Sequence, residues 1–432
     1  MGDKIRTVSA TEIMAERGTL GLEVTVTTES GAVGRATPTA GVSASKFEAA
    51  FVVDGGSRYS GRGLKQAIEN VGRASREIIG IDVSRQYEID KLLIAADGTE
   101  DKSNLGANVI VGISLAVCDA AARSAGVPLF RYLGGATARV FPMPIFGICL
   151  CGRYRDPGKT RWLKPSYEYI PYGATGFENA LEMTYEAQQE FRRIIIERCG
   201  PNVYRQQSLK DSYHAFFLAG AIEDDRVILD AMSEAVIKAG YEGKIGIYFD
   251  AAAGCYYERD IDRYVGIYSE GEKDRNQMIA LYKEMVANYP LISLEDPLYE
   301  EDYEGHAEVT EALGIEIVGD DLFTTNIKRL KEGVALGAAN SMVVKITQVG
   351  TLTEALEAVE YCRQHNYNIH PCGSRGDQSS IADIALGLGA GQVRGCDWGR
   401  MRELEQELGS QAVWPGKAFF KRGSRGTWAS ET

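Results

Sequence analysis

The sequence predicts a two-part α/β protein, in which a smaller α+β segment over residues 1–140 caps a β/α barrel over residues 141–432. Short apolar strands alternate with longer amphipathic stretches after residue 140, and several such units in series are typical of a parallel barrel. The 432 residues are also enough for a barrel and a second unit.

The N-terminal segment predicts a strand, a loop and two helices. LEVTVTT at 22–28 alternates in polarity and is rich in β-branched residues, which favours a strand. GAVGRATPTAGVSAS at 31–45 is rich in Gly, Ser, Thr and Pro, which indicates a loop. Helical patterns follow at 63–79 and 105–125.

The barrel segment contains four predicted strands that each end in a charged side chain. They are KIGIYFDAA (244–252), LISLEDP (291–297), IEIVGDDL (315–322) and SMVVKIT (341–347). Amphipathic helices separate them, such as TLTEALEAVEYCRQHN at 351–366. Catalytic groups of such barrels lie at the carboxyl ends of the strands, so we expect the charged groups to meet at one rim.

Composition narrows the functional classes. A net charge of -13 argues against binding to nucleic acid, because phosphate backbones repel an acidic protein. The eight cysteines form no CxxC pair, so we expect reduced core residues. The N-terminus lacks an apolar leader, and no segment approaches the roughly 20 apolar residues of a membrane span. A cytoplasmic location without a membrane partner is therefore expected.

Asp250, Glu295, Asp320 and Lys345 are the candidate catalytic constellation. They are 45, 25 and 25 residues apart, the length of successive βα units. Three converging carboxylates repel one another unless a cation lies between them, and hard oxygen ligands favour Mg²⁺. A lysine beside that metal has a lowered pKa and acts as a base. The alternative is that each acid only caps the helix that follows its strand.

At these residues the sequence resembles the enolase family. The resemblance is carried by SLEDPLYEEDYEG, VGDDLFTTN and VVKITQVGTLTEALEA, and by DGTEDKSNLGANVIVGISLAVCDAAA, ERGTLGLEV and RELEQELG. It implies an N-terminal α+β cap and a modified (β/α)8 barrel. It also implies that Asp250, Glu295 and Asp320 hold Mg²⁺, that Lys345 abstracts a proton, and that the protein is a homodimer or homo-octamer.

The sequence departs from the family where a proton donor is expected. Ala215 stands at the position of the glutamate in the family's GDEGG segment, and His214 beside it is a candidate replacement. In the stretch KPSYEYIP, Ser166 matches a second family glutamate, whereas a small shift brings in Glu168, which is a candidate for binding substrate. The family's second active-site lysine is replaced by Asp397 or lost near residue 396.

The substrate-binding candidates lie in two segments. HPCGSRGD at 370–377 replaces the family's phosphate-binding SHRSGE, and supplies His370, Ser374 and Arg375. The loop at 151–164 carries five cations, among them Arg155 and Lys159, which suit a second anion. The alternative is a solvated basic surface loop. His306 and His365 are expected to be surface groups.

These departures favour a specialised enzyme over a phosphopyruvate hydratase. The hypothesis is a phosphonate-pathway enzyme acting on a small phosphorylated carboxylic acid through an enolate, such as carboxyphosphonoenolpyruvate synthase of phosphinothricin-type biosynthesis, with a CMP ester as second substrate. Two alternatives remain: an ordinary hydratase that uses His214 or Glu168 as the acid, and a non-catalytic binding protein that keeps the fold.

Overall fold

The computed structural model describes most of the 432 residues. The described residues are 2–15, 19–40, 45–152, 164–201, 215–218, 222, 224–269, 271–376, 378–422 and 426–427, with the backbone alone at 152, 215–218, 378–379, 422 and 426–427.

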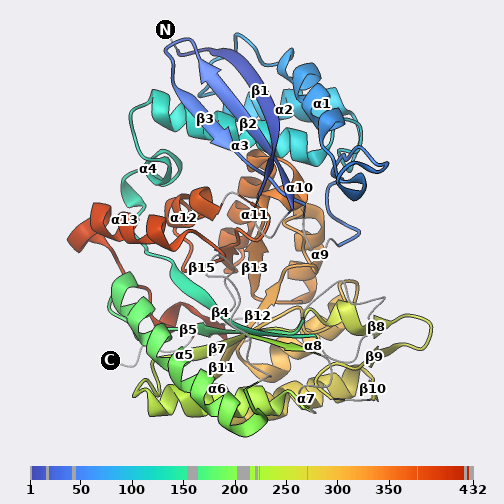
Figure 1. Cartoon of the computed structure of the whole chain (residues 1–432), viewed down its shortest axis with the longest axis vertical. Coiled ribbons are helices and arrows are strands. Elements are labelled where there is room, and N and C mark those ends of the chain that lie inside the picture. The colour runs from blue at the N-terminus through green and yellow to red at the C-terminus, as the bar shows by residue number, and fades with distance from the viewer. Residues whose placement is uncertain are drawn as a thin grey trace.

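The cap is a three-stranded antiparallel sheet covered by helices (Figure 1). Its elements are β1 (Ile5–Met14), β2 (Leu20–Thr28), β3 (Val33–Ala36), α1 (Lys65–Ser75), α2 (Gln86–Asp97), α3 (Ala107–Ser124) and α4 (Leu129–Gly134). Leu22, Val24 and Val26 alternate along β2 and are fully buried, so one face of the sheet packs on the helices. The strand predicted at 22–28 is confirmed, and helices lie within both predicted helical stretches.

The loop predicted at 31–45 is wrong in part, because β3 lies inside it and pairs with β2. Gly34 shows why the glycine-rich composition of this segment does not indicate a loop throughout. A Cβ atom at Gly34 would lie 2.1 Å from the carbonyl oxygen of Ala116 on α3. The glycine therefore marks a close approach between strand and helix and not a turn.

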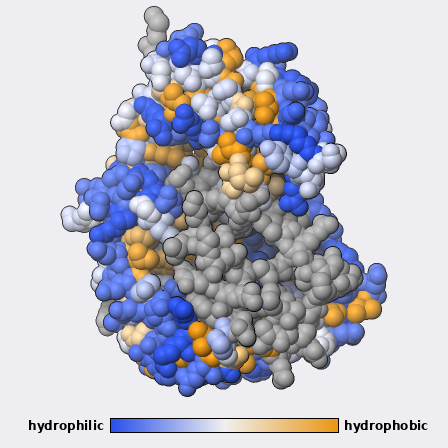
Figure 2. All heavy atoms as spheres, in the orientation of Figure 1, coloured by the Kyte–Doolittle hydropathy of each residue, from blue (hydrophilic) through white to orange (hydrophobic). Residues whose placement is uncertain are grey.

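Helix α3 is the one helix among the described residues that is long and apolar enough to cross a membrane. However, 83% of that 18-residue stretch is buried inside the fold. It packs against β2 and β3 as the core helix of the cap. The coloured residues in Figure 2 are mainly hydrophilic, with small hydrophobic patches over the cap and the barrel.

The second part of the chain is a nearly closed barrel, as predicted. The strands run in the order β14-β13-β12-β11-β7-β5-β4-β15, and a bridge between Cys372 and Arg394 links the two ends. Their bounds are β4 (Met143–Gly152), β5 (Ser166–Ile170), β7 (Gly246–Asp250), β11 (Leu291–Glu295), β12 (Glu316–Gly319), β13 (Ser341–Val344), β14 (Asn368–Pro371) and β15 (Gln392–Arg394). β5 is antiparallel to both neighbours, which is the modification of the (β/α)8 pattern.

Helices cover the outside of the barrel (Figure 1). They are α5 (Phe177–Cys199), α6 (Arg226–Lys238), α7 (Arg275–Asn288), α8 (Tyr303–Leu313), α9 (Ile327–Leu336), α11 (Leu352–Gln364), α12 (Gln378–Gly387) and α13 (Trp398–Leu408). The short helix α10 (Ile346–Val349) is instead buried, and it follows Lys345 on the side that contacts α3 of the cap. A short strand, β6 (Ala215–Leu218), pairs with β4. The four predicted barrel strands are confirmed as β7, β11, β12 and β13.

Strand alternation sorts the side chains inside the barrel into layers. Tyr248 and Asp250 are two residues apart on β7, so they point to the same side at successive levels. The antiparallel register places Ser166 opposite Asp250 and Glu168 opposite Tyr248. The level of Asp250 is therefore the rim, and the level of Tyr248 and Glu168 is the layer directly beneath it.

Glu316 ties several strands together in the barrel interior. Its fully buried carboxylate accepts hydrogen bonds from Ser293 (2.9 Å), Asn368 (2.8 Å) and Gln392 (2.8 and 3.0 Å). These donors come from β11, β14 and β15, so one residue of β12 links strands from across the sheet.

We expect Glu316→Ala to destabilise the protein by at least about 3 kcal/mol. The variant removes the acceptor of the Ser293 hydroxyl and of the Gln392 amide, and it leaves the Asn368 amide with only its bond to the carbonyl of Phe419, so three buried hydrogen-bonding partners are lost at about 1–3 kcal/mol each. Urea unfolding of the variant measures the loss. Glu242→Ala, at an exposed turn residue, is the control and should leave the free energy of unfolding unchanged. An equal midpoint for both variants would contradict the role of Glu316.

The prediction that His306 is a surface group is wrong. His306 on α8 is fully buried, and its Nδ1 lies 2.8 Å from the carbonyl oxygen of Asp302. Burial lowers the pKa of His306 from 6.5 to about 4, so the neutral ring is the folded form. His365 on the α11 side of the barrel is exposed, as predicted.

This buried ring predicts a loss of stability in acid. The folded-state pKa of His306 is lowered, so its contribution is present above pH 6.5 and is lost as the pH falls towards 4, by about 3 kcal/mol. His306→Asn keeps the donor at the Nδ1 position but removes the titration. The variant should therefore lose less stability than the native protein between pH 6.5 and 4.

The chain offers a matched control for this measurement. His365 has the same contact, with Nδ1 2.9 Å from the carbonyl of Tyr361, but its ring is exposed. His365→Asn should follow the native pH profile in urea unfolding. If His306→Asn also follows that profile, the buried ring does not cause the acid sensitivity.

Candidate functional site

The four predicted catalytic residues meet at the rim of the barrel. Asp250 ends β7 and Glu295 ends β11, where they are paired in register. Asp320 directly follows β12, and Lys345 directly follows β13. All four are buried, with relative exposures of 1%, 1%, 8% and 8%. Sequence spacing therefore predicted their common location, while their individual roles stay predictions.

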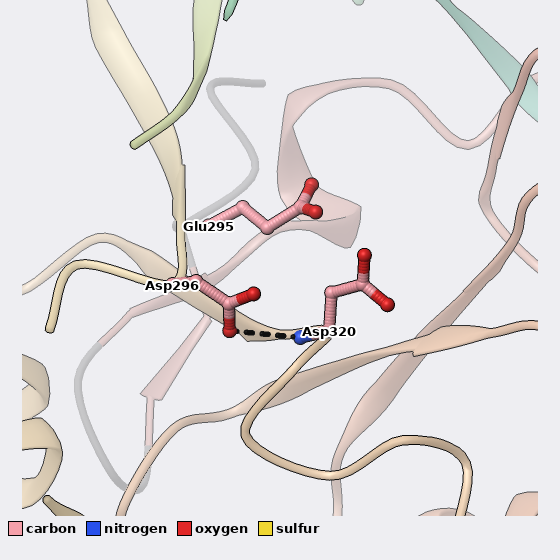
Figure 3. Close-up of side chains that lie close together, drawn as sticks. All are labelled: Glu295, Asp296 and Asp320. Atoms are coloured by element: carbon pink, nitrogen blue, oxygen red, sulfur yellow. Dashed lines mark hydrogen bonds between the residues drawn. The ribbon is translucent and has the colours of Figure 1, made fainter. Parts of the chain in front are cut away.

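An additional acid, Asp296, lies in the same cluster. Oxygen atoms of Glu295, Asp296 and Asp320 lie within 4.8 Å of one another (Figure 3). Asp296, however, accepts backbone N–H groups of Asp320 (3.0 Å), Asp321 (2.8 Å) and Leu322 (3.4 Å). Both of its oxygens are thus engaged in holding the turn after β12, which makes Asp296 a positioning residue for Asp320.

Three cations compensate the acids. Lys345 donates to Asp320, and Lys164 donates to Asp250. Arg394, at the end of β15, donates to Glu295 at 2.8 Å, to Asp250 at 3.0 and 3.1 Å, and to Glu168. One guanidinium thus bridges three buried carboxylates, a geometry for which its planar fork of donors is suited.

The pKa shifts follow the position of these cations. Burial raises the pKa of Asp250, but Lys164 and Arg394 outweigh that effect, so its pKa is lowered. The same opposition between burial and Lys345 lowers the pKa of Asp320. Burial and the charge of Asp250 raise the pKa of Glu295 well above its usual range. Without a further cation, the protonated form of Glu295 is therefore favoured, whereas additional positive charge at the cluster would favour its carboxylate form.

Lys345 differs from the expectation for a base beside a metal. Burial lowers the pKa of its ammonium group, but the contact with Asp320 outweighs burial and raises the pKa. The predicted lowering required the charge of a divalent cation, which would compete with Lys345 for Asp320.

Asp397 does not replace the family's second lysine at the rim, whereas the alternative, that this lysine is lost near residue 396, stays a prediction. Asp397 lies outside the rim, where its carboxylate caps α13 by accepting the N–H groups of Gly399 (2.8 Å) and Arg400 (3.2 Å). Arg394 instead supplies a second cation at the acids. The sequence signal was GQVR at 391–394, a strand of three residues that ends in a cation in the way the other barrel strands end in charges.

Both candidates on β5 face the site. The hydroxyl of Ser166 lies 3.2 Å from Asp250 and 3.1 Å from Arg394, which places it at the rim. Glu168 is fully buried in the layer below and pairs with Arg394. The proposed contact of Glu168 with substrate stays a prediction.

Arg375, in the segment after β14, lies close to the acid cluster. Its guanidinium is 5% exposed and pairs with Glu48 of the cap, a residue that sequence analysis missed. Gln348 connects this pair to the cluster, since its amide donates to Asp320 at 2.9 Å and to Glu48 at 3.4 Å. Ser374 precedes Arg375 and is partly buried, whereas His370 is fully buried and contacts Tyr248. Their contacts with substrate stay predictions.

Three predicted residues lie outside the described residues: His214, Arg155 and Lys159. Ala215, which replaces the family's glutamate, begins β6 beside Cys149 of β4. The position at which the family has a glutamate therefore lies on a strand of the same sheet as the acid cluster.

The donor set of the cluster suits a hard divalent cation. It consists of carboxylate oxygens, which are the ligands that Mg²⁺ prefers. Among the described residues no donor reaches the buried Oδ1 of Asp250, although a buried carboxylate oxygen ordinarily has a partner. A cation at this oxygen would supply the missing interaction and the missing positive charge.

We expect Arg394→Met to destabilise the metal-free protein by about 3–5 kcal/mol, because it removes the charge that three buried carboxylates share. Arg394→Lys should lose less, since it keeps the charge but not the fork. Thermal unfolding without and with Mg²⁺ measures both, and added Mg²⁺ should recover part of the loss. Arg402→Met, at a half-exposed ion pair, is the control. Equal effects at the two arginines would contradict this assignment.

Comparison with known proteins identifies both parts of the chain. Residues 5–133 match the model of the enolase N-terminal domain, and residues 138–423 match that of the enolase C-terminal TIM barrel domain. A protein named enolase from Methanopyrus kandleri is 39% identical over 435 residues, which is 96% of this chain and 99% of that protein. Proteins named enolase from Thermococcus gammatolerans and Pyrococcus furiosus are both 38% identical over 431 residues, and each match covers 96% of this chain and 97% or more of the relative.

These relatives overturn the hypothesis of a phosphonate-pathway synthase, together with its CMP ester and its transferase chemistry. Matches of 36–39% identity over nearly the full length are to proteins named enolase. The hypothesis rested on the loss of the glutamate that Ala215 replaces and on the basic loop at 151–164, and the full-length similarity to proteins named enolase outweighs both departures. The chain belongs to the enolase family of Mg²⁺-dependent lyases.

Proposed function

We propose that the protein is a phosphopyruvate hydratase, which interconverts 2-phosphoglycerate and phosphoenolpyruvate. The observation that carries this proposal is the placement of the Lys345 amine at Asp320, on the rim where Asp250 and Glu295 also end their strands. The names of the full-length relatives support the same substrate class.

We assign Asp250, Glu295 and Asp320 as the residues that hold Mg²⁺. The bare Oδ1 of Asp250 and the raised pKa of Glu295, due to burial and to Asp250, support this assignment. The bound ion supplies positive charge that stabilises the substrate carboxylate when the neighbouring carbon loses its proton.

Lys345 is the base in this proposal, and two arginines orient the substrate. Lys345 takes the proton from the carbon beside the carboxylate. Arg394 is at the rim with a guanidinium suited to bidentate contact with that carboxylate. Arg375 binds the phosphate, which takes over the position of the Glu48 carboxylate at its guanidinium.

The departing hydroxyl needs a proton from a group other than the family's glutamate. Ala215 has no acidic proton to give. Lys164 is the described cation best placed for this step, because its ammonium contacts Asp250 and lies 3.5 Å from the hydroxyl of Ser166. Glu168 is held by Arg394 in the layer below, and His214 stays an alternative prediction.

A cytoplasmic location and assembly as a homodimer or homo-octamer complete the proposal. Both rest on the family resemblance.

We expect the purified protein with Mg²⁺ to form phosphoenolpyruvate from 2-phosphoglycerate. The absorbance of phosphoenolpyruvate measures the rate of this reaction. Lys345→Met should lower kcat by about 10²–10⁴-fold, because it removes the base, while calorimetry should still detect Mg²⁺ binding. Lys328→Met, at an exposed ion pair on the barrel surface, is the matched control and should keep native turnover. A protein that binds Mg²⁺ but forms no phosphoenolpyruvate would contradict the proposed reaction, and one that binds no Mg²⁺ would favour a non-catalytic protein.

A further inference from the structure

A tyrosine lies directly beneath the acids of the rim. Tyr248 precedes Asp250 by two residues on β7, and its side chain is fully buried inside the barrel. Its phenol donates a hydrogen bond to Oε2 of Glu295. The guanidinium of Arg394 lies over the Tyr248 ring, 5.6 Å from its centroid, and also donates to Oε2 of Glu295 at 2.8 Å.

These contacts distinguish the two oxygens of Glu295. Within the described part of the chain, the hydrogen bonds of its carboxylate both end on Oε2. Two donors on one oxygen fix the rotation of the carboxylate and leave Oε1 turned away from them. In Figure 3 the carboxylate of Glu295 extends into the same space as that of Asp320.

His370 supports the phenol from β14. Its Nε2 lies 3.3 Å from the hydroxyl oxygen of Tyr248, and the two rings meet edge to face at 5.6 Å between centroids. The phenol has one proton, which it gives to Glu295, so the imidazole must donate Nε2–H to the phenol oxygen. Nδ1 of His370 then carries no proton, which agrees with the lack of a hydrogen-bond acceptor for it among the described residues.

We propose that Tyr248 is a positioning residue for the metal site: its phenol, held by His370, orients Glu295 so that the other carboxylate oxygen faces Mg²⁺. This inference rests on the proposed metal ligands. Groups that hold a ligand from behind commonly change metal affinity by about 10–100-fold when they are removed. The burial of all three side chains excludes solvent from replacing the hydrogen bonds.

Mg²⁺ titration calorimetry of the metal-free full chain tests the phenol directly. Tyr248→Phe removes one oxygen atom and should weaken Mg²⁺ binding by about 10–100-fold. Tyr169→Phe is the matched control, because Tyr169 on the neighbouring strand is equally buried and its phenol donates to the carbonyl of Met232 at 2.8 Å, away from the acids. Tyr169→Phe should leave Mg²⁺ affinity unchanged.

Two substitutions of His370 test the support beneath the phenol. His370→Gln carries an amide donor near the former Nε2 position and should keep most of the Mg²⁺ affinity, whereas the shorter His370→Asn should weaken binding. Because His370 acts through Tyr248, the double variant Tyr248→Phe, His370→Asn should bind Mg²⁺ no more weakly than Tyr248→Phe alone.

The outcomes separate this inference from the proposed function. If the native chain binds no Mg²⁺, the proposed metal site is wrong. If the native chain binds Mg²⁺ and Tyr248→Phe binds it equally or more tightly, the metal site stands and the role of Tyr248 is wrong. Additive losses in the double variant would overturn the link from His370 through Tyr248.

Discussion

The repulsion among buried carboxylates is the constraint on which the site depends. Asp250, Glu295 and Asp296 are almost completely buried within one small volume, and Asp320 is 8% exposed beside them. Like charges at such distances cannot all remain ionised without compensation. Lys164 and Lys345 each pair with one of these acids, and Arg394 also contacts Asp250, so all three supply positive charge that reduces the repulsion. Oδ1 of Asp250, which has no partner among the described residues, is a position where a bound cation would add further positive charge.

The barrel holds these acids together because the inward-pointing side chains of its strands lie in successive layers. Residues two apart on one strand point the same way, so a rim position and a supporting position come together. Asp250 and Tyr248 on β7 form one such pair, and Ser166 and Glu168 on β5 form another. The acids are therefore supported from below by neutral and charged hydrogen-bonding groups, which loops alone would hold less rigidly.

Sequence reasoning located the parts of the site that are periodic. Four apolar strands ending in charges predicted the rim, because strand ends of a parallel barrel share one edge. Arg394 was missed because its strand has only three residues, too few to show a clear pattern. The comparison with the family's second lysine was made at Asp397 instead. Glu48 reaches Arg375 from 327 residues away, and local pattern cannot predict such a contact. His306 sits on the inner side of a helix whose polar neighbours concealed its burial.

The groups proposed to bind metal and remove the proton lie on different structural elements from the groups that would protonate the departing hydroxyl. This separation explains how the sequence could lose the second set while keeping the first. The acids, Lys345 and Arg394 stand at strand ends or directly after them, where substitution disturbs barrel packing and charge balance together. The position of the family's glutamate lies on β6, a short strand that pairs with β4 outside the closed order of strands, and Lys164 lies just before β5. Positions outside the regular strands of a scaffold tolerate change better than the strands themselves. A family member can therefore lose the acid at Ala215 and recruit a rim cation, such as Lys164, while the half that binds metal and removes the proton keeps its geometry.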